Sequence, residues 1–367
     1  MIMEDKTLRN TPLVDIHKSL GAKLAPFGGW LMPIQYEGII AEHAWTRKSA
    51  SLFDICHMGE FLISGDTPES DLNRILTCDI PGINIGRCRY GFMLKENGGI
   101  IDDLVTYRIQ DKIWMLVVNA ATSDRDFAHI KENLSRNSSI EDISVRTAKL
   151  DLQGPLSQDV LAKLVSERVL NLTYYSFAKF AVLGSNSIIS RTGYTGELGY
   201  ELYVDASKVE NLWGMLLKDD RVKPAGLGAR DTLRLEMGYP LYGQELDETI
   251  TPLEADMESF VDFNKDFIGK EVLLKKKEEG LEKKIIHFIS SSRRSPRHDD
   301  IIFSEGKEVG HVTSGSFSPS LGLGIGVGYV ENGYDWIGSK ITIKDKNKEL
   351  QAEITDKPFY KEGTARK

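Results

Sequence analysis

The stretch "RYGFMLKENGGIIDDLVTYRI", residues 89–109, holds the clearest local information on how this chain folds. At its centre, Asn97-Gly98 favours a tight turn, because both central residues of a type I′ turn need positive φ. The runs on either side, "RYGFML" and "IIDDLVTYRI", are mostly apolar. We therefore expect them to pair as the antiparallel strands of a β-hairpin.

The second run of this hairpin carries two adjacent carboxylates, Asp102 and Asp103. Side chains alternate across a strand, so the two are predicted to lie on opposite faces. The expected neighbours are Ile100 and Leu104 for Asp102, and Ile101, Val105 and Tyr107 for Asp103. Carboxylates in an apolar strand cost folding free energy unless they have partners, and Asp is disfavoured in strands. Both residues therefore need an explanation beyond folding.

Outside the hairpin, the composition is that of an ordinary globular protein of 367 residues, long enough for two or three domains. A formal net charge of −8 argues against a nucleic-acid-binding protein. Cys56, Cys78 and Cys88 lack the spacing of a zinc site, so we expect reduced thiols and no metal. With neither a basic leader nor an apolar run of ~20 residues, we expect a cytoplasmic protein with no membrane contact.

Two segments share one order of elements. "EFLISGDTPESDLNRIL" and "KLDLQGPLSQDVLAKLV" both predict a strand, then a glycine, then a helix. The pattern favours two related α+β units, although the two segments share few identities. After about residue 282 only short strands with turn residues between them are predicted, which is typical of a small all-β barrel.

The glycine-rich segments do not predict a nucleotide site. "GLGIGVG" lacks the third glycine of the dinucleotide-binding motif, and no phosphate-binding GxxxxGK[ST] sequence occurs. A strand packed closely against another backbone is the better interpretation.

Three charged or polar residues stand out elsewhere. Glu201 follows the glycine-rich loop in "SRTGYTGELGYELYV", where it is either a solvated strand residue or a carboxylate that binds two parallel N–H donors of a planar heterocycle. Arg230, in the helical run "GLGARDTLRLEMG", either lies along the protein surface or binds an anion. His57 is adjacent to Cys56, and neighbouring strand residues point to opposite faces, so we expect a structural histidine and not a Cys-His nucleophile.

Taken together, "FGGWLMPIQY", "LFDICHMGEF", "GGIIDDLVTY", "RTGYTGELGYE", "GLGARDTLRLEMGYPLYG" and "HVTSGSFSPSLGLGIGVGYV" resemble the aminomethyltransferase of the glycine cleavage system, the T-protein family. The motifs occur in the family's order and span nearly the whole chain. One departure is Cys56, where serine is usual in the family.

The resemblance implies an α+β multi-domain fold, with two related α+β (ferredoxin-like) units that form a folate-binding core and a small C-terminal β-barrel. It also implies that the first two units interleave along the chain. We expect residues 1–50 with 145–205 in the first unit, 51–144 with 206–278 in the second, and 282–367 in the barrel.

The resemblance further implies the reaction. The family transfers the aminomethyl carbon from the dihydrolipoyl arm of the H-protein to tetrahydrofolate, giving 5,10-methylenetetrahydrofolate and ammonia, without metal or flavin. Its catalytic carboxylate matches the first aspartate of "IDD", Asp102, and a structural role is left for Asp103.

Other site residues are also implied by the resemblance. The pterin-binding carboxylate matches Glu201, and the folate-binding arginine matches Arg230. Further expected folate contacts are Met58, Tyr90, Asn119, Tyr174 and Tyr194. Arg297 is the expected contact for the lipoyl arm.

Two alternatives share the fold: a folate-dependent demethylase, and a folate-binding or regulatory protein that catalyses no transfer. The intact "IDD" favours an enzyme. A folate-binding iron–sulfur assembly factor is disfavoured, because its signature "KGCYxGQE" is absent.

Overall fold

The predicted hairpin is present in the computed structural model, which describes residues 8–345 and 348–367. It consists of β6 (Cys88–Leu94) and β7 (Ile100–Gln110). These strands belong to a five-stranded sheet of order β6-β7-β8-β5-β9, with β8 (Ile113–Val118), β5 (Gly59–Gly65) and β9 (Ser138–Asp142). Helices α3 (Pro68–Ile75) and α4 (Ser123–Asn133) cover one face of this sheet.

A β-bulge interrupts the pairing of β6 and β7 beside the two aspartates. Met93 lies opposite Asp102 and Leu94 lies opposite Ile100, so Ile101 has no partner on β6. An extra residue of this kind shifts the alternation of side chains by one position.

The bulge reverses part of the predicted side-chain pattern. Ile101 packs under the helices together with Leu104, whereas Ile100 packs in a separate core. The prediction for the two isoleucines is therefore wrong, because sequence alternation does not reveal the extra residue. Asp102 and Asp103 both follow the bulge, and they lie on opposite faces as predicted.

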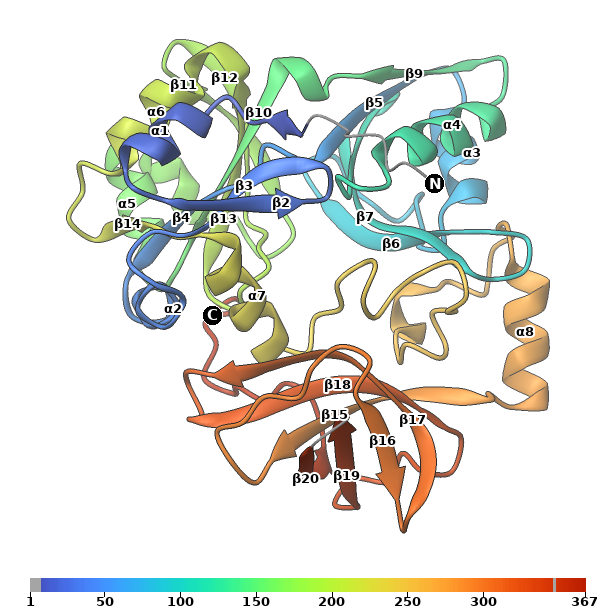
Figure 1. Cartoon of the computed structure of the whole chain (residues 1–367). Helices are drawn as coiled ribbons and strands as arrows, with labels where there is room; N and C mark the ends of the chain where they lie inside the picture. Colours follow the sequence, from blue (N-terminus) through green and yellow to red (C-terminus); the bar gives the residue numbers. More distant parts are fainter. Residues whose placement is uncertain (1–7, 346–347) are drawn as a thin grey trace.

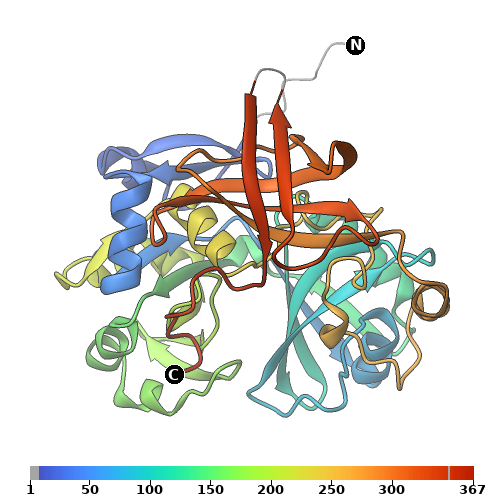
Figure 2. The same ribbon diagram turned by 90° about the horizontal axis from the view of Figure 1, so that it is seen from below.

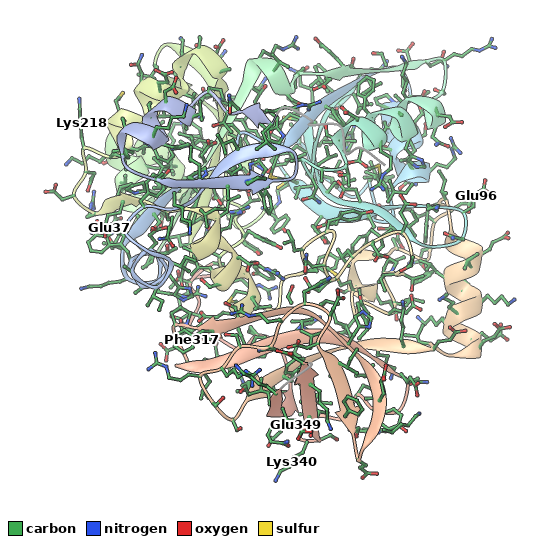
Figure 3. All side chains as sticks on the ribbon, viewed as in Figure 1. Glu37, Glu96, Lys218, Phe317, Lys340 and Glu349 are labelled. Carbon is green, nitrogen blue, oxygen red and sulfur yellow. The ribbon has the colours of Figure 1, made fainter. Side chains whose placement is uncertain are left out.

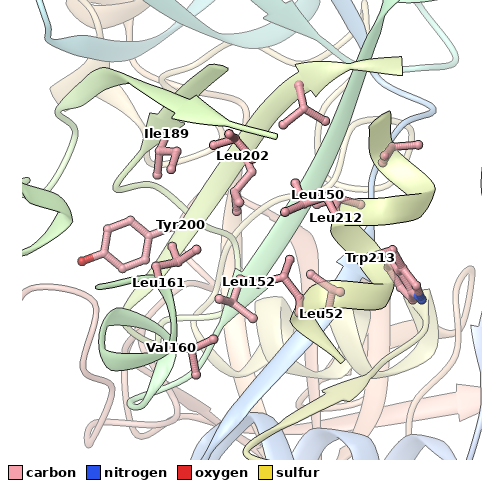
Figure 4. Packing of buried hydrophobic residues seen from close by; sticks show 14 of the residues in the cluster. Leu52, Leu150, Leu152, Val160, Leu161, Ile189, Tyr200, Leu202, Leu212 and Trp213 are labelled. Atoms are coloured by element: carbon pink, nitrogen blue, oxygen red, sulfur yellow. The ribbon is translucent and has the colours of Figure 1, made fainter. Parts of the chain in front are cut away.

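A second, six-stranded sheet has the order β11-β12-β13-β10-β4-β14. Its strands are β4 (Ala50–Asp54), β10 (Thr147–Gln153), β11 (Phe177–Val182), β12 (Ser185–Ser190), β13 (Gly199–Asp205) and β14 (Val222–Pro224). Helices α5 (Ser157–Leu164) and α6 (Val209–Leu216) pack on it. Figure 4 shows this core, where Leu150, Leu152 and Leu202 from the strands meet Leu212 and Trp213 of α6.

The two sheets share the strand-glycine-helix arrangement that the sequence predicts. Gly65 ends β5 and Gly154 follows β10, with φ of +141° and +138°. A Cβ at Gly65 would lie 2.1 Å from the carbonyl oxygen of Asn137, and one at Gly154 would lie 2.2 Å from that of Ser49. Both positions therefore require glycine for the same two reasons, conformation and close approach of a neighbouring backbone.

The five-stranded sheet is inserted into the six-stranded one along the chain. β4 and β10 are hydrogen-bonded neighbours, yet residues 59–142 lie between them in sequence. Residues 206–224, which we expected in the second unit, contribute α6 and β14 to the first. The reason is that the apolar side of α6 joins the first core and β14 pairs with β4.

The remaining elements before the C-terminal domain include a small sheet and four α-helices. A three-stranded sheet contains β1 (Arg9–Asn10), β2 (Lys23–Phe27) and β3 (Trp30–Gln35). The other helices are α1 (Val14–Ser19), α2 (Ile39–Lys48), α7 (Leu227–Glu236) and α8 (Lys270–Glu279). In Figure 1, α7 lies between the six-stranded sheet and the C-terminal domain.

The C-terminal domain is a closed barrel of order β15-β18-β17-β16-β19-β20, as predicted. Its strands are β15 (Lys283–Ser290), β16 (Ile301–Ser304), β17 (Lys307–Ser318), β18 (Leu323–Glu331), β19 (Lys340–Asp345) and β20 (Lys348–Thr355). Three glycines of "GLGIGVG", Gly324, Gly326 and Gly328, lie on β18, and a Cβ at Gly324 would lie 2.1 Å from the carbonyl oxygen of Arg294. The close backbone packing expected for this segment is thus confirmed.

Seen from below, the barrel lies across both α+β units (Figure 2). Long charged side chains such as those of Glu37, Lys218 and Lys340 project from the periphery (Figure 3). The functional groups described next lie in the interior instead.

Candidate active site

All three parts of the molecule contribute to one central cavity of about 1290 Å³. Its walls include Glu201 of the six-stranded sheet, Asp103 of the five-stranded sheet and Ser314 of the barrel. This volume exceeds the ~300–1,000 Å³ of common small-molecule pockets. The cavity therefore has room for one extended ligand together with a second, smaller group.

Glu201 is buried in the cavity wall, which excludes the solvated-strand interpretation. Its Oε2 accepts hydrogen bonds from the hydroxyls of Thr192 (2.8 Å) and Tyr203 (3.1 Å). Its Oε1 lies 3.5 Å from Nζ of Lys149. Burial alone would raise the pKa of Glu201, but the cations Lys149 and Arg230 outweigh it, so the pKa lies below its usual value. Glu201 is therefore a fixed negative charge.

Arg230 also lines the cavity, and it is paired rather than spread along the surface. Its guanidinium forms an ion pair with the buried carboxylate of Asp151 on β10 and lies 4.9 Å from the ring centre of Tyr194. Only 13% of its side chain is exposed. Burial nevertheless raises the pKa of Asp151, to about 6, despite the guanidinium. Arg230 thus presents a positioned cation beside an aromatic wall.

Asp103 lies on the opposite wall, on the cavity face of β7. The hydroxyl of Tyr90 donates to Asp103 Oδ2 (2.9 Å), and Nδ2 of Asn119 donates to Asp103 Oδ1 (2.9 Å). Burial and repulsion from Asp102 raise the pKa of Asp103 to about 7. A carboxylate with this pKa is suited to general base catalysis near neutral pH.

Asp102 does not line the cavity. Its side chain is fully buried on the other face of β7, where Oδ2 accepts the backbone N–H of Asn119 (3.0 Å) and Oδ1 accepts its Nδ2 (2.9 Å). The sequence prediction put Asp102 at the folate and gave Asp103 a structural position. Of the two residues, Asp103 lines the cavity and Asp102 does not, because the cavity lies on the Asp103 face of the strand.

The other predicted contacts are brought together at the cavity: Met58, Tyr90, Asn119, Tyr174, Tyr194 and Arg297. Tyr194 stacks on Tyr239, with ring centres 5.8 Å apart. Arg297 approaches from the barrel side, where its backbone N–H donates to Asp300. His57 also lines the cavity, and burial lowers its pKa to about 4, so the ring is neutral.

The sequence prediction missed Lys149 and Asp151. They occupy alternate positions of β10, opposite Tyr203 and Glu201 in the ladder. Two charges at i and i+2 in the otherwise apolar strand "AKLDL" indicate one polar face inside the protein. That pattern could have identified both residues as partners of the site.

In the part of the chain that the structure describes, no group of three or more His, Cys, Asp or Glu side chains could hold a metal ion. The helices of residues 8–345 and 348–367 are too short or too polar to cross a membrane.

Two protein-family models match this chain. The GCVT N-terminal domain matches residues 13–265, and the glycine cleavage T-protein C-terminal barrel domain matches residues 283–361. Together they cover both sheets, the barrel and every residue of the cavity discussed above.

Full-length relatives agree with these matches. A protein from Desulforamulus reducens named "Aminomethyltransferase" is 45% identical over 358 residues, covering 96% of this chain and 98% of that protein. One of the same name from Caldanaerobacter subterraneus subsp. tengcongensis is 43% identical over 360 residues, 96% of each. The crystal structure of glycine cleavage system aminomethyltransferase T from Bartonella henselae has a TM-score of 0.92 at 31% identity, covering 98% of this chain and 99% of that one.

Proposed function

The chain belongs to the glycine cleavage T-protein family, and on this basis we propose that it is a tetrahydrofolate-dependent aminomethyltransferase. The donor is an aminomethyl group on the dihydrolipoyl arm of the H-protein. The carbon–sulfur bond and the bond to the amino nitrogen break, while two new bonds join the carbon to N5 and N10 of tetrahydrofolate. Of the two protons lost from these nitrogens, one restores the thiol and the other leaves with ammonia.

One observation carries the proposal: a fixed carboxylate and a titratable carboxylate face the same large cavity. Glu201 has the charge and the burial needed to accept the two parallel N–H donors of a pterin. The aromatic rings of Tyr174, Tyr194 and Tyr239 offer flat surfaces for the rest of folate. A volume of about 1290 Å³ leaves space for the donor arm as well.

We assign the role of general base to Asp103, in place of Asp102. Asp103 borders the cavity with a pKa of about 7, so its ionised form can accept a proton from the attacking nitrogen at neutral pH. Tyr90 and Asn119 fix both of its oxygens. The rival role, a folate-binding protein without catalysis, gives no reason for holding such a carboxylate at the wall.

The arm of the H-protein enters, in this proposal, on the barrel side of the cavity near Arg297. The test is turnover with aminomethylated H-protein and tetrahydrofolate, measured as ammonia release. We expect release that requires both substrates. Tight folate binding without any ammonia release would show a binding protein instead. Transfer of a methyl group from a free methylated compound to tetrahydrofolate, giving 5-methyltetrahydrofolate and the demethylated compound without H-protein, would show a demethylase.

A further inference from the structure

Behind Asp103, two more carboxyl groups are buried against each other. Asp102 of β7 and Asp126 of α4 are both fully buried. Their carboxyl groups face each other closely enough for a side-chain hydrogen bond. Neither oxygen of Asp126 accepts a hydrogen bond of normal geometry among the residues that the structure describes, although the hydroxyl of Thr122 is near enough to lower its pKa. If both groups were ionised, two negative charges would be buried against each other, with only a long contact between Asp126 and Arg125 to offset them, which is costly.

The surroundings supply little compensating charge. Nε of Arg125 lies 4.0 Å from Asp126 Oδ1, but the same guanidinium is already bonded to Glu248 and to the hydroxyl of Tyr242 (2.8 Å). Asp103 adds a third acidic group on the cavity side. Asn119 connects these groups, since its Nδ2 reaches Asp102 Oδ1 and Asp103 Oδ1 at 2.9 Å each.

We infer that Asp102 and Asp126 share one proton at neutral pH and act as positioning residues that hold Asn119, and through it Asp103. With the proton on Asp126, its O–H donates to Asp102. Both oxygens of Asp102 then remain acceptors for the two N–H groups of Asn119. The effect on catalysis rests on the proposed function of Asp103, whereas the shared proton does not.

The charge environment supports this sharing. Burial raises the pKa of Asp102 well above its usual value, and repulsion from Asp126 adds to the shift. Burial likewise raises the pKa of Asp126 to about 7. A group whose pKa is raised on folding stabilises the folded protein below its unfolded pKa of ~3.9, and this stabilisation is lost as the pH rises towards the folded pKa.

The first test measures melting temperature against pH for wild type, Asp126→Asn and a matched control, Asp124→Asn. Asp124 is on the same helix and its side chain is 91% exposed. An amide at 126 can donate to Asp102 without titrating. We therefore expect the melting temperature of Asp126→Asn to rise relative to that of wild type by on the order of 5 °C between pH ~4 and ~7. The difference between Asp124→Asn and wild type should not change over this range. For Asp126→Asn, a difference from wild type that does not change with pH would overturn the shared proton.

A second measurement detects the proton itself. The infrared difference spectrum of wild type minus Asp126→Asn at pH ~7 should contain the C=O stretch of a protonated carboxyl group. Its absence, with Asp124→Asn as the blank, would mean that the pair is fully ionised and that the inference is wrong.

The third test addresses positioning. In Asp126→Leu, the lone buried Asp102 is expected to take up a proton, so that one oxygen no longer accepts from Asn119. We expect kcat to fall about tenfold with little change in KM for folate, and Asp126→Asn to recover most of the loss. Equal kcat in the Leu and Asn variants would refute the positioning role. If wild type itself releases no ammonia, the proposed function fails, and the first two tests still decide whether the proton is shared.

Discussion

The two walls of the cavity solve the problem of buried carboxylates in different ways. On the six-stranded sheet, Glu201 and Asp151 each have a cation beside them, Lys149 and Arg230. On the five-stranded sheet, Asp103 is held by a hydroxyl and an amide only. The pKa of Glu201 is consequently lowered, and that of Asp103 is raised to about 7. The cations keep Glu201 ionised, which suits recognition, although burial still raises the pKa of Asp151 to about 6. The neutral donors around Asp103 leave a proton free to move, which suits catalysis.

The strongest test of this difference between the two walls is Asp103→Asn, for which we expect the largest effect. The amide keeps the size of the side chain but cannot take a proton, so kcat should fall by ~10²–10⁴-fold while the folate Kd changes only a few-fold. Ammonia release and calorimetric titration with folate measure the two quantities. Asp102→Asn, on the other face of the strand, should cost less activity; the opposite order would return the catalytic role to Asp102.

The pH dependence of kcat in the wild-type protein tests the proposed role of the same carboxylate. Because Asp103 must be ionised to accept a proton, kcat should be level above about pH 7 and fall about tenfold per unit below it. An ordinary aspartate would move this limb to about pH 4. A limb near 4 would therefore contradict the raised pKa of Asp103. If Asp103 is the titrating group, Asp103→Asn should abolish the limb, and a limb that persists in this variant would belong to another residue.

Glu201→Gln tests the wall formed by the six-stranded sheet, and we expect an effect of intermediate size on folate binding. It replaces a charge-assisted pair of hydrogen bonds by neutral ones and also leaves Lys149 without its partner, so we expect folate binding to weaken by on the order of 1–3 kcal/mol. Calorimetry measures this loss. Glu353→Gln, at an exposed strand position of the barrel, is the matched control. Unchanged affinity in Glu201→Gln would remove this residue from the pterin site.

Arg230→Lys should give the smallest effect of the series. The positive charge beside Asp151 is kept, but the planar contact with Tyr194 is lost, so a loss of about 1 kcal/mol in folate binding is expected. Arg168→Lys is the control, because Arg168 lies over the ring of Phe180 outside the cavity. If both substitutions leave the Kd unchanged, Arg230 does not contact folate and serves only Asp151.

Much of this architecture is visible in the sequence where the signal is local. The Asn97-Gly98 turn predicts the hairpin, and the turn-rich segment after about residue 282 predicts the barrel. The bulge at Ile101 was missed because an extra residue shows only in the pairing with β6. The placement of β14 was missed for a related reason, since Val222 pairs with Ala50 and no local pattern marks so distant a neighbour.

For the site, the resemblance identified Glu201 and Arg230, which do line the cavity, but it selected the wrong member of the aspartate pair for the wall. Two adjacent carboxylates look alike in a motif, and only the position of the cavity distinguishes them. Lys149 was missed because a lysine in a strand is ordinarily read as exposed, whereas this one is buried beside Glu201.

The insertion of one sheet within the other has a consequence for the order of folding. The inserted chain leaves and returns on neighbouring strands, since Phe61 of β5 pairs with Asp142 of β9. It can therefore close on itself as soon as residue 142 has been synthesised. The surrounding sheet must wait for β14, because the contact between Ala50 and Val222 spans the whole insertion. Contacts between such distant residues form slowly. On the ribosome, the wall that carries Asp103 is thus expected to be complete before the sheet that carries Glu201 is closed.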